Sequence, residues 1–152
     1  MTVGGQSCTL LYRPRVTHDM PVPAHNDNSN ASCDVLIVED NTFVCDVMST
    51  FLAQRGLAVR TAPAATAALA VLDEMTPRVA VLDYHLPGIN GVQLAGAMRQ
   101  RGLAVPIIMM SANIVVPEEE TLRKLGVRLF IHKPVPLLPL YQAITRLVRA
   151  IG

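Results

Sequence analysis

The chain has 152 residues, of which 51% are hydrophobic and 16% are charged, and its formal net charge is +1. This length suits one domain with a short extension, and it is enough to bury a core. The basic residues are scattered without aromatic neighbours, so the composition gives no support to a nucleic-acid-binding face. No apolar run is as long as a membrane span, the N-terminus lacks the layout of a signal peptide, and the three cysteines have no CxxC spacing. We therefore predict a cytoplasmic protein with reduced thiols and no contact with a membrane.

Residues 1–33 differ in composition from the rest of the chain. They contain several prolines and a polar run from His25 to Asn30, and they show no sustained hydrophobic period. This composition predicts a flexible N-terminal tail, and the alternative is an arm that becomes ordered on contact with a partner. The composition and the hydrophobic pattern change at Asp34, so we predict one folded domain over residues 34–152.

Short apolar runs and helical patterns alternate through this domain. The predicted strands cover residues 35–38, 58–62, 79–83, 106–110 and 129–131. The predicted helices fall at about 43–56, 64–75, 94–102, 117–126 and 140–151. Because parallel strands need crossover connections, this alternation predicts an α/β fold in which a five-stranded parallel sheet carries helices on both faces.

Four of the five predicted strands end in polar or charged residues. These are Glu39 and Asp40, then Asp83, Ser111 and Lys133. The carboxyl ends of parallel strands share one edge of a sheet, so we expect the five side chains to converge there. Three crowded carboxylates repel one another unless a cation neutralises them, and oxygen ligands favour a hard ion such as Mg²⁺. With an ammonium and a hydroxyl facing the metal, the site suits an incoming phosphoryl group that Asp83 would attack as a nucleophile.

Each of these residues also has a plain structural interpretation. Asp40 can cap the helix that follows it, Ser111 can be an ordinary loop residue, and Lys133 can be a solvated charge. The functional interpretation depends on their coincidence at one edge of the predicted sheet.

Residues 34–152 resemble the receiver domain of two-component response regulators. The motifs that carry the resemblance are residues 35–41 (VLIVEDN), Asp83 with residues 86–91 (LPGING), Ser111-Ala112, and Phe130 followed by Lys133-Pro134. The resemblance implies a doubly wound, flavodoxin-like sheet in the strand order 2-1-3-4-5. It also implies a phosphoprotein of signal transduction or a phosphorelay, which catalyses only its own phosphoryl transfer and dephosphorylation and is otherwise not an enzyme.

By this resemblance, Asp83 is the phosphoacceptor, and the product is an aspartyl phosphate. Asp40 is a direct ligand of Mg²⁺, Glu39 reaches the ion through water, and the backbone carbonyl of His85 supplies another oxygen. Lys133 is the lysine that binds the phosphoryl group, and its peptide bond to the following proline is expected to be cis.

The resemblance also assigns the switch and the residues that set the lifetime of the phosphorylated state. Ser111 is the hydroxyl that follows the phosphoryl group, and Phe130 is the aromatic residue that moves with it, although a tyrosine is commoner at that position. His85 and Asn113 occupy the two positions at which side chains tune dephosphorylation, where an imidazole can either position water or shield the phosphoryl group.

The partners implied are a histidine kinase or a histidine phosphotransfer protein, and a downstream protein that binds the fourth helix, the fifth strand and the last helix. Because the chain ends after the last predicted helix, we expect a single-domain regulator that signals through protein contacts and not through direct nucleic-acid binding. One alternative is a receiver-like interaction module that works without phosphorylation. Another is a phosphatase of the haloacid dehalogenase type, which would place a second aspartate where His85 stands. The sequence leaves open the cognate kinase, the target, homodimerisation, the role of the tail, and whether the domain was excised from a longer hybrid protein.

Overall fold

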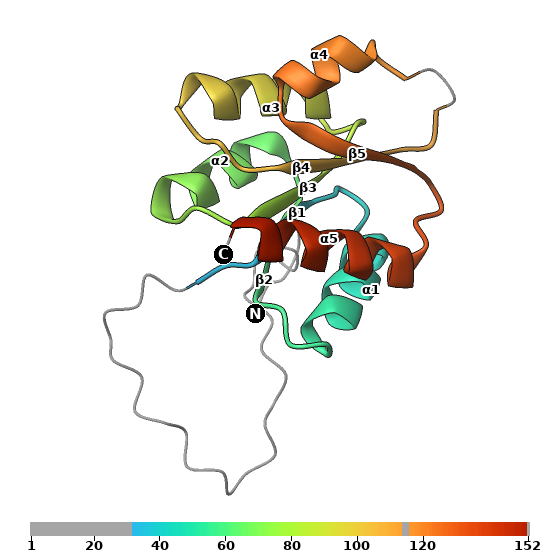
Figure 1. The fold of residues 1–152 in the computed structure, drawn as a ribbon. Coiled ribbons are helices and arrows are strands. Elements are labelled where there is room, and N and C mark those ends of the chain that lie inside the picture. The colour runs from blue at the N-terminus through green and yellow to red at the C-terminus, as the bar shows by residue number, and fades with distance from the viewer. Residues whose placement is uncertain (1–31, 114–115, 152) are drawn as a thin grey trace, which may run out of the picture.

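The computed structural model describes residues 32–113 and 116–151 (Figure 1). The tail predicted for residues 1–33 lies almost wholly outside the described residues, and so do residues 114–115. Five strands alternate with five helices along the chain. The strands are β1 (Val35–Val38), β2 (Val59–Ala62), β3 (Val79–Asp83), β4 (Ile107–Ser111) and β5 (Val127–His132). The helices are α1 (Thr42–Ala53), α2 (Ala65–Glu74), α3 (Gly91–Gln100), α4 (Glu119–Lys124) and α5 (Leu137–Ile151).

The strands form one parallel sheet in the order β2-β1-β3-β4-β5. All residues of β1 and β3 are buried, as expected for strands that are covered on both faces. This topology confirms the predicted fold class, a doubly wound parallel sheet. It also means that the carboxyl ends of all five strands lie along one edge.

Successive residues of the central strands point to opposite faces of the sheet, and each face has its own core. Leu36 and Leu82 pack with the buried faces of α2, α3 and α4, whereas Ile37 and Val81 pack with α1 and α5. Figure 1 shows the same division, with α2, α3 and α4 on one side of the sheet and α1 and α5 on the other. The two cores hold the sheet rigidly between helices, so the loops at its edges start from fixed positions.

Several details differ from the predicted elements. Strand β5 runs from Val127 to His132 instead of over residues 129–131, and α3 begins at Gly91 instead of near residue 94. Helix α4 begins at Glu119, two residues after Pro117, because the N-cap residue Glu118 has extended backbone angles. Helix α5 begins at Leu137 rather than Leu140 and holds Pro139 in its first turn, where a missing N–H costs no hydrogen bond. In α1 the helical spacing was predicted correctly, but its first apolar residue is not buried: Phe43 is 75% exposed.

Within the described ranges, no helix is both long and apolar enough to cross a membrane. Cys33 and Cys45 are buried. Burial raises the pKa of the Cys33 thiol to about 11, so this thiol is protonated and unreactive at neutral pH.

Candidate functional site

Hydrogen bonds across the carboxyl edge of the sheet fix the positions of the strand-end residues. The amide of Lys133 donates to the carbonyl of Ser111 at 2.8 Å, and the amide of Tyr84 donates to the carbonyl of Met110 at 2.7 Å. The ladder of β3, β4 and β5 therefore continues one residue into the loops that follow β3 and β5. The peptide bond between Lys133 and Pro134 is cis, as predicted.

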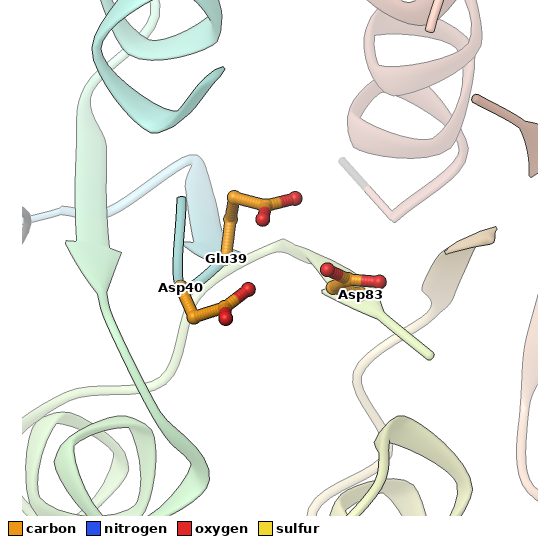
Figure 2. A group of neighbouring side chains, drawn as sticks. All are labelled: Glu39, Asp40 and Asp83. Atoms are coloured by element: carbon orange, nitrogen blue, oxygen red, sulfur yellow. The ribbon is translucent and has the colours of Figure 1, made fainter. Parts of the chain in front are cut away.

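Three carboxylates meet at this edge. Glu39 and Asp40 follow β1, and Asp83 ends the neighbouring strand β3; Figure 2 shows their side chains gathered around a common space. One carboxylate oxygen from each residue lies within 4.8 Å of the others. Glu39 is fully buried and Asp83 is 3% exposed, whereas Asp40 is exposed. A compact set of hard oxygen donors with one open side fits a Mg²⁺ ion that keeps several of its waters.

Lys133 lies between the two buried carboxylates. Its Nζ atom is 2.6 Å from Oε2 of Glu39 and 2.8 Å from Oδ2 of Asp83. Burial alone would lower the pKa of the ammonium, but the hydrogen bonds to Asp83 and Glu39 outweigh burial and raise the pKa above its ordinary value. Lys133 is therefore a fixed positive charge next to the carboxylate of Asp83.

For Glu39 burial has the larger effect on the pKa, whereas for Lys133 the hydrogen bonds together do. Burial raises the pKa of its carboxyl group, the hydrogen bonds from Lys133 and from the amide of Asn41 oppose that rise, and the charge of Asp83 adds to it. The net shift is upward although Glu39 has a cationic partner, because the burial of this carboxyl group outweighs the hydrogen bonds from Lys133 and Asn41. In this arrangement the site carries more negative charge than Lys133 neutralises, which favours an additional cation.

Ser111 and the loop residues after β3 and β4 complete the rim of the site. The Ser111 hydroxyl is buried and accepts a hydrogen bond from the amide of Asn113 at 3.0 Å. The amide of His85 donates to Oδ1 of Asp83 at 3.1 Å, so both oxygens of Asp83 are held in place. The side chains of Asn113 and His85 approach to 2.7 Å, and this contact joins the β3–α3 loop to the loop after β4.

The structure thus brings together every predicted strand-end residue. Comparison with known proteins then identifies the family, because residues 35–145 match the response regulator receiver domain. The chain belongs to this family. Receiver domains are signalling domains of two-component systems, as the sequence motifs predicted.

Relatives of this receiver domain include proteins of different architecture. It is 28% identical over 116 residues to an uncharacterized 14.6 kDa protein of Leptolyngbya boryana, a match that covers 75% of this chain and 88% of that protein. It is 26% identical over 140 residues to the sensor histidine kinase RcsC of Escherichia coli, a match that covers 89% of this chain but only 15% of the kinase. Its fold is similar to that of a CheY-like receiver domain protein from Methanospirillum hungatei, with a TM-score of 0.71 and 25% identity, over 79% of this chain and 96% of that one. The chain therefore spans most of the first relative and a small part of the kinase.

One residue that the receiver domain needs was not singled out from the sequence. A Cβ atom on Gly91 would lie 2.5 Å from the backbone oxygen of Asp83, so no larger residue fits there without moving the chain. The amide of Gly91 also donates to the carbonyl of Tyr84 at 2.8 Å, which closes the β3–α3 loop on itself. The preceding Asn90 was noted only as part of the motif at residues 86–91, but it forms a capping box with Gln93 at the start of α3. Gly91 and Asn90 together fix the loop that carries His85.

Phe130 lies on β5, two strands away from Asp83. It is partly buried, packs against the core under α4, and makes an edge contact with the ring of His132, with 5.6 Å between ring centroids. Its ring therefore stands at the boundary between the core and the surface formed by α4 and β5.

Proposed function

We propose that this receiver domain accepts a phosphoryl group on Asp83 from a histidine kinase or a histidine phosphotransfer protein, in a Mg²⁺-dependent reaction in the cytoplasm. The observation that carries the proposal is the surroundings of Asp83. Its buried carboxylate lies within 4.8 Å of oxygens of Glu39 and Asp40, and 2.8 Å from the ammonium of Lys133. We assign the receiver unit to residues 34–152 and treat residues 1–33 as an extension of it.

The residues proposed to hold Mg²⁺ are Glu39, Asp40 and Asp83, together with the backbone carbonyl of His85. Their chemistry fits the ion, since all are hard oxygen donors and two of the carboxylates are buried beside an exposed one. When bound, Mg²⁺ supplies positive charge for the phosphoryl oxygens.

The chain's own residues then have separate tasks in the transfer. A carboxylate oxygen of Asp83 forms a bond to phosphorus as the bond from phosphorus to the donor's imidazole nitrogen breaks. That nitrogen keeps the electron pair and takes a proton from solvent. Lys133 is placed to bind a phosphoryl oxygen, and the buried hydroxyl of Ser111 can donate a hydrogen bond to another once it rotates.

We assign the readout to Ser111 and Phe130. A hydroxyl that turns toward the new phosphoryl group changes the packing at the end of β4, next to β5 and Phe130. The surface over α4 and β5 exposes Val116 (41%) and Leu129 (40%), which gives a target protein an apolar contact that borders Phe130. The downstream partner is therefore proposed to bind α4, β5 and α5.

A second apolar surface adjoins the acceptor site and suits the phosphodonor. Phe43 and Leu138 are 75% and 52% exposed, and Val47 is 38% exposed. Phe43 and Val47, together with the segment after Lys133, border a hollow of about 270 Å³ that Lys133 itself lines. A donor helix that covers this surface would place its phosphohistidine beside Asp83 while it excludes water, so we assign the donor contact to α1 and the β5–α5 loop.

Phosphoryl incorporation tests the proposal. The purified protein is incubated with acetyl phosphate and MgCl₂ and analysed on a phosphate-affinity gel beside an Asp83→Asn variant. We expect a Mg²⁺-dependent shifted band that the variant lacks. If neither acetyl phosphate nor phosphorylated donor proteins produce this band, the interaction module that works without phosphorylation replaces the proposal.

Phe43→Asp tests the donor contact separately. This variant should accept phosphate from acetyl phosphate at the normal rate but from a phosphorylated phosphotransfer protein more slowly. Leu129→Asp is the matched control, since it adds the same charge to an exposed apolar position on the edge strand β5, outside the surface around Phe43. Equal transfer rates for the two variants would contradict the assignment of the donor to α1.

A further inference from the structure

A basic pocket lies at the amino edge of the sheet, away from the carboxylate cluster. The end of α3, the loop from α3 to β4, the end of α4 and the start of β5 surround a hollow of about 380 Å³. Its basic lining residues are Arg99, Arg123, Lys124 and Arg128, and among the described residues that line it none is acidic. Leu103, Ala104 and Pro106 give the pocket an apolar side.

Two of the four cations already have partners. Arg99 donates through Nε to the carbonyl of Leu125 at 2.6 Å and through Nη2 to the carbonyl of Val105 at 2.7 Å, and it also donates to the carbonyl of Leu103. Lys124 pairs with Glu120 across one helical turn at 3.3 Å. Arg99 therefore serves to join the loops after α3 and α4.

The other two cations, Arg123 and Arg128, have no such partner. Over residues 32–113 and 116–151, neither side chain makes a hydrogen bond or an ion pair. Glu119 borders a neighbouring groove together with both arginines, but it lies beyond ion-pair distance. Basic residues are common at helix ends because they complement the helix dipole, but Arg128 stands on β5, so that explanation does not cover it.

Few acidic groups balance the positive charge of this pocket, and Arg99 on its wall is held in place by hydrogen bonds. Burial lowers the pKa of the Arg99 guanidinium, and the charge of Arg128 lowers it further. Gly126, at φ +80°, packs directly against the guanidinium of Arg99, and a Cβ atom there would overlap it. The pocket therefore combines a rigid arginine wall, two uncommitted guanidinium groups and an apolar side.

We propose that this pocket binds a small organic polyanion that carries at least two phosphate groups, of the nucleoside diphosphate class. The forked donors of Arg123 and Arg128 match phosphate oxygens in a bidentate manner, and Lys124 adds a point charge. The side formed by Leu103 and Pro106 offers an apolar contact to the organic part of the ligand. Occupancy would hold the end of α4 against the end of α3, so the ligand acts on the helix that borders the proposed target surface.

The test uses ADP as the probe with the full-length protein. EDTA is present so that ADP does not bind Mg²⁺ and is not drawn by the ion to the site around Asp83. In ¹H–¹⁵N spectra, the amides of Gly102 and Gly126 should shift on titration, because both glycines line the pocket. The amides of Gly88 and Gly91 should stay in place, because Gly88 lies in the β3–α3 loop and Gly91 begins α3, both at the opposite edge of the sheet. Shifts confined to those last two glycines would overturn the proposal.

Calorimetry with matched variants tests the role of the two arginines. Because charged hydrogen bonds to phosphate are lost, the double variant Arg123→Gln/Arg128→Gln should bind ADP at least about tenfold more weakly than the parent. Arg146→Gln removes an exposed cation from α5 and should leave the affinity unchanged. Binding of pyrophosphate as tight as that of ADP would overturn the assignment to a nucleoside diphosphate, because the apolar side would then contribute nothing to binding. No measurable binding, equal weakening in both variants, or binding of an acidic peptide in place of ADP would refute the proposal.

Discussion

Removal of the Lys133 ammonium should destabilise the receiver domain in a way that Mg²⁺ reverses. In Lys133→Met the side chain keeps its apolar stem but loses the cation that lies 2.6 Å from Glu39 and 2.8 Å from Asp83. Two carboxylates that are almost completely buried then face each other without a neutralising charge. The variant must tolerate this repulsion or protonate one of the two acids.

The cost of protonation limits the effect. The ordinary pKa of a glutamate carboxyl group is 4.5 and burial raises that of Glu39, so protonation of Glu39 at pH 7 costs at most about 3.4 kcal/mol, at 1.36 kcal/mol for each pH unit. Removal of one partner from a fully buried ion pair costs about 3–5 kcal/mol. The Lys133 side chain is 21% exposed, so solvent screens part of the interaction, and the cost of its removal falls at or below the lower end of that range. We therefore expect a loss of about 2–3 kcal/mol in the free energy of unfolding.

Urea unfolding followed by circular dichroism at pH 7 measures this loss, once in EDTA and once in MgCl₂ at the same ionic strength. The loss should be largest in EDTA and should shrink in MgCl₂, because a divalent ion that binds only the native state supplies the missing charge. Lys124→Met is the control, since its pair with Glu120 is exposed on both sides and should change stability by less than about 0.5 kcal/mol. Parental stability of Lys133→Met in EDTA, or an equal loss in both buffers, would refute the electrostatic reasoning.

Three further predictions concern the loops and the metal. Gly91→Ala should lower the free energy of unfolding by about 1–3 kcal/mol, because the added Cβ would lie 2.5 Å from a backbone oxygen. Gly96→Ala is the control, since this glycine lies in open space within α3 and the change should be neutral or stabilising. Equal effects of the two variants in urea unfolding would contradict this contrast. The Mg²⁺ affinity, measured by calorimetry, should fall as the pH is lowered while it is still above 4.5. The reason is that burial raises the pKa of Glu39 and a protonated carboxyl group binds the ion poorly. An affinity that does not change through that pH range would argue against Glu39 as a ligand. His85→Ala and Asn113→Ala should each speed the decay of the phosphorylated protein, and the double variant should decay no faster than either, because the two side chains act through one contact of 2.7 Å; additive effects would show that they act independently.

The sheet could be predicted because its central strands are buried on both faces. Such strands appear in the sequence as continuous apolar runs, as residues 35–38 and 79–82 do, and the loops between them are short. The first and last residues of the helices could not be predicted as closely. At Glu118 the backbone is extended before α4 starts, and this depends on the path of the preceding loop, which the Pro-Glu pattern does not encode.

The convergence of the acids with Lys133 follows from topology alone, since parallel strands end at one edge. The pairing of Lys133 with both Glu39 and Asp83 does not follow, because it depends on the length and direction of side chains that come from three strands. The exposure of Phe43 was also beyond prediction: helical spacing shows which residues share a face, but not whether another element covers that face. Gly91 was missed for a similar reason, since a close approach between a loop and the end of a strand leaves only a glycine as its signal.

The central claim is that the carboxylate of Asp83 receives the phosphoryl group, and chemical trapping tests it most directly. After incubation with acetyl phosphate and MgCl₂, borohydride reduces an acyl phosphate to an alcohol, so a phosphorylated aspartate becomes homoserine. Mass spectrometry of the digested protein should find homoserine at position 83 only, and only when Mg²⁺ was present. Homoserine at another aspartate while Asp83 stays intact, or incorporation that is unchanged in EDTA, would contradict the account.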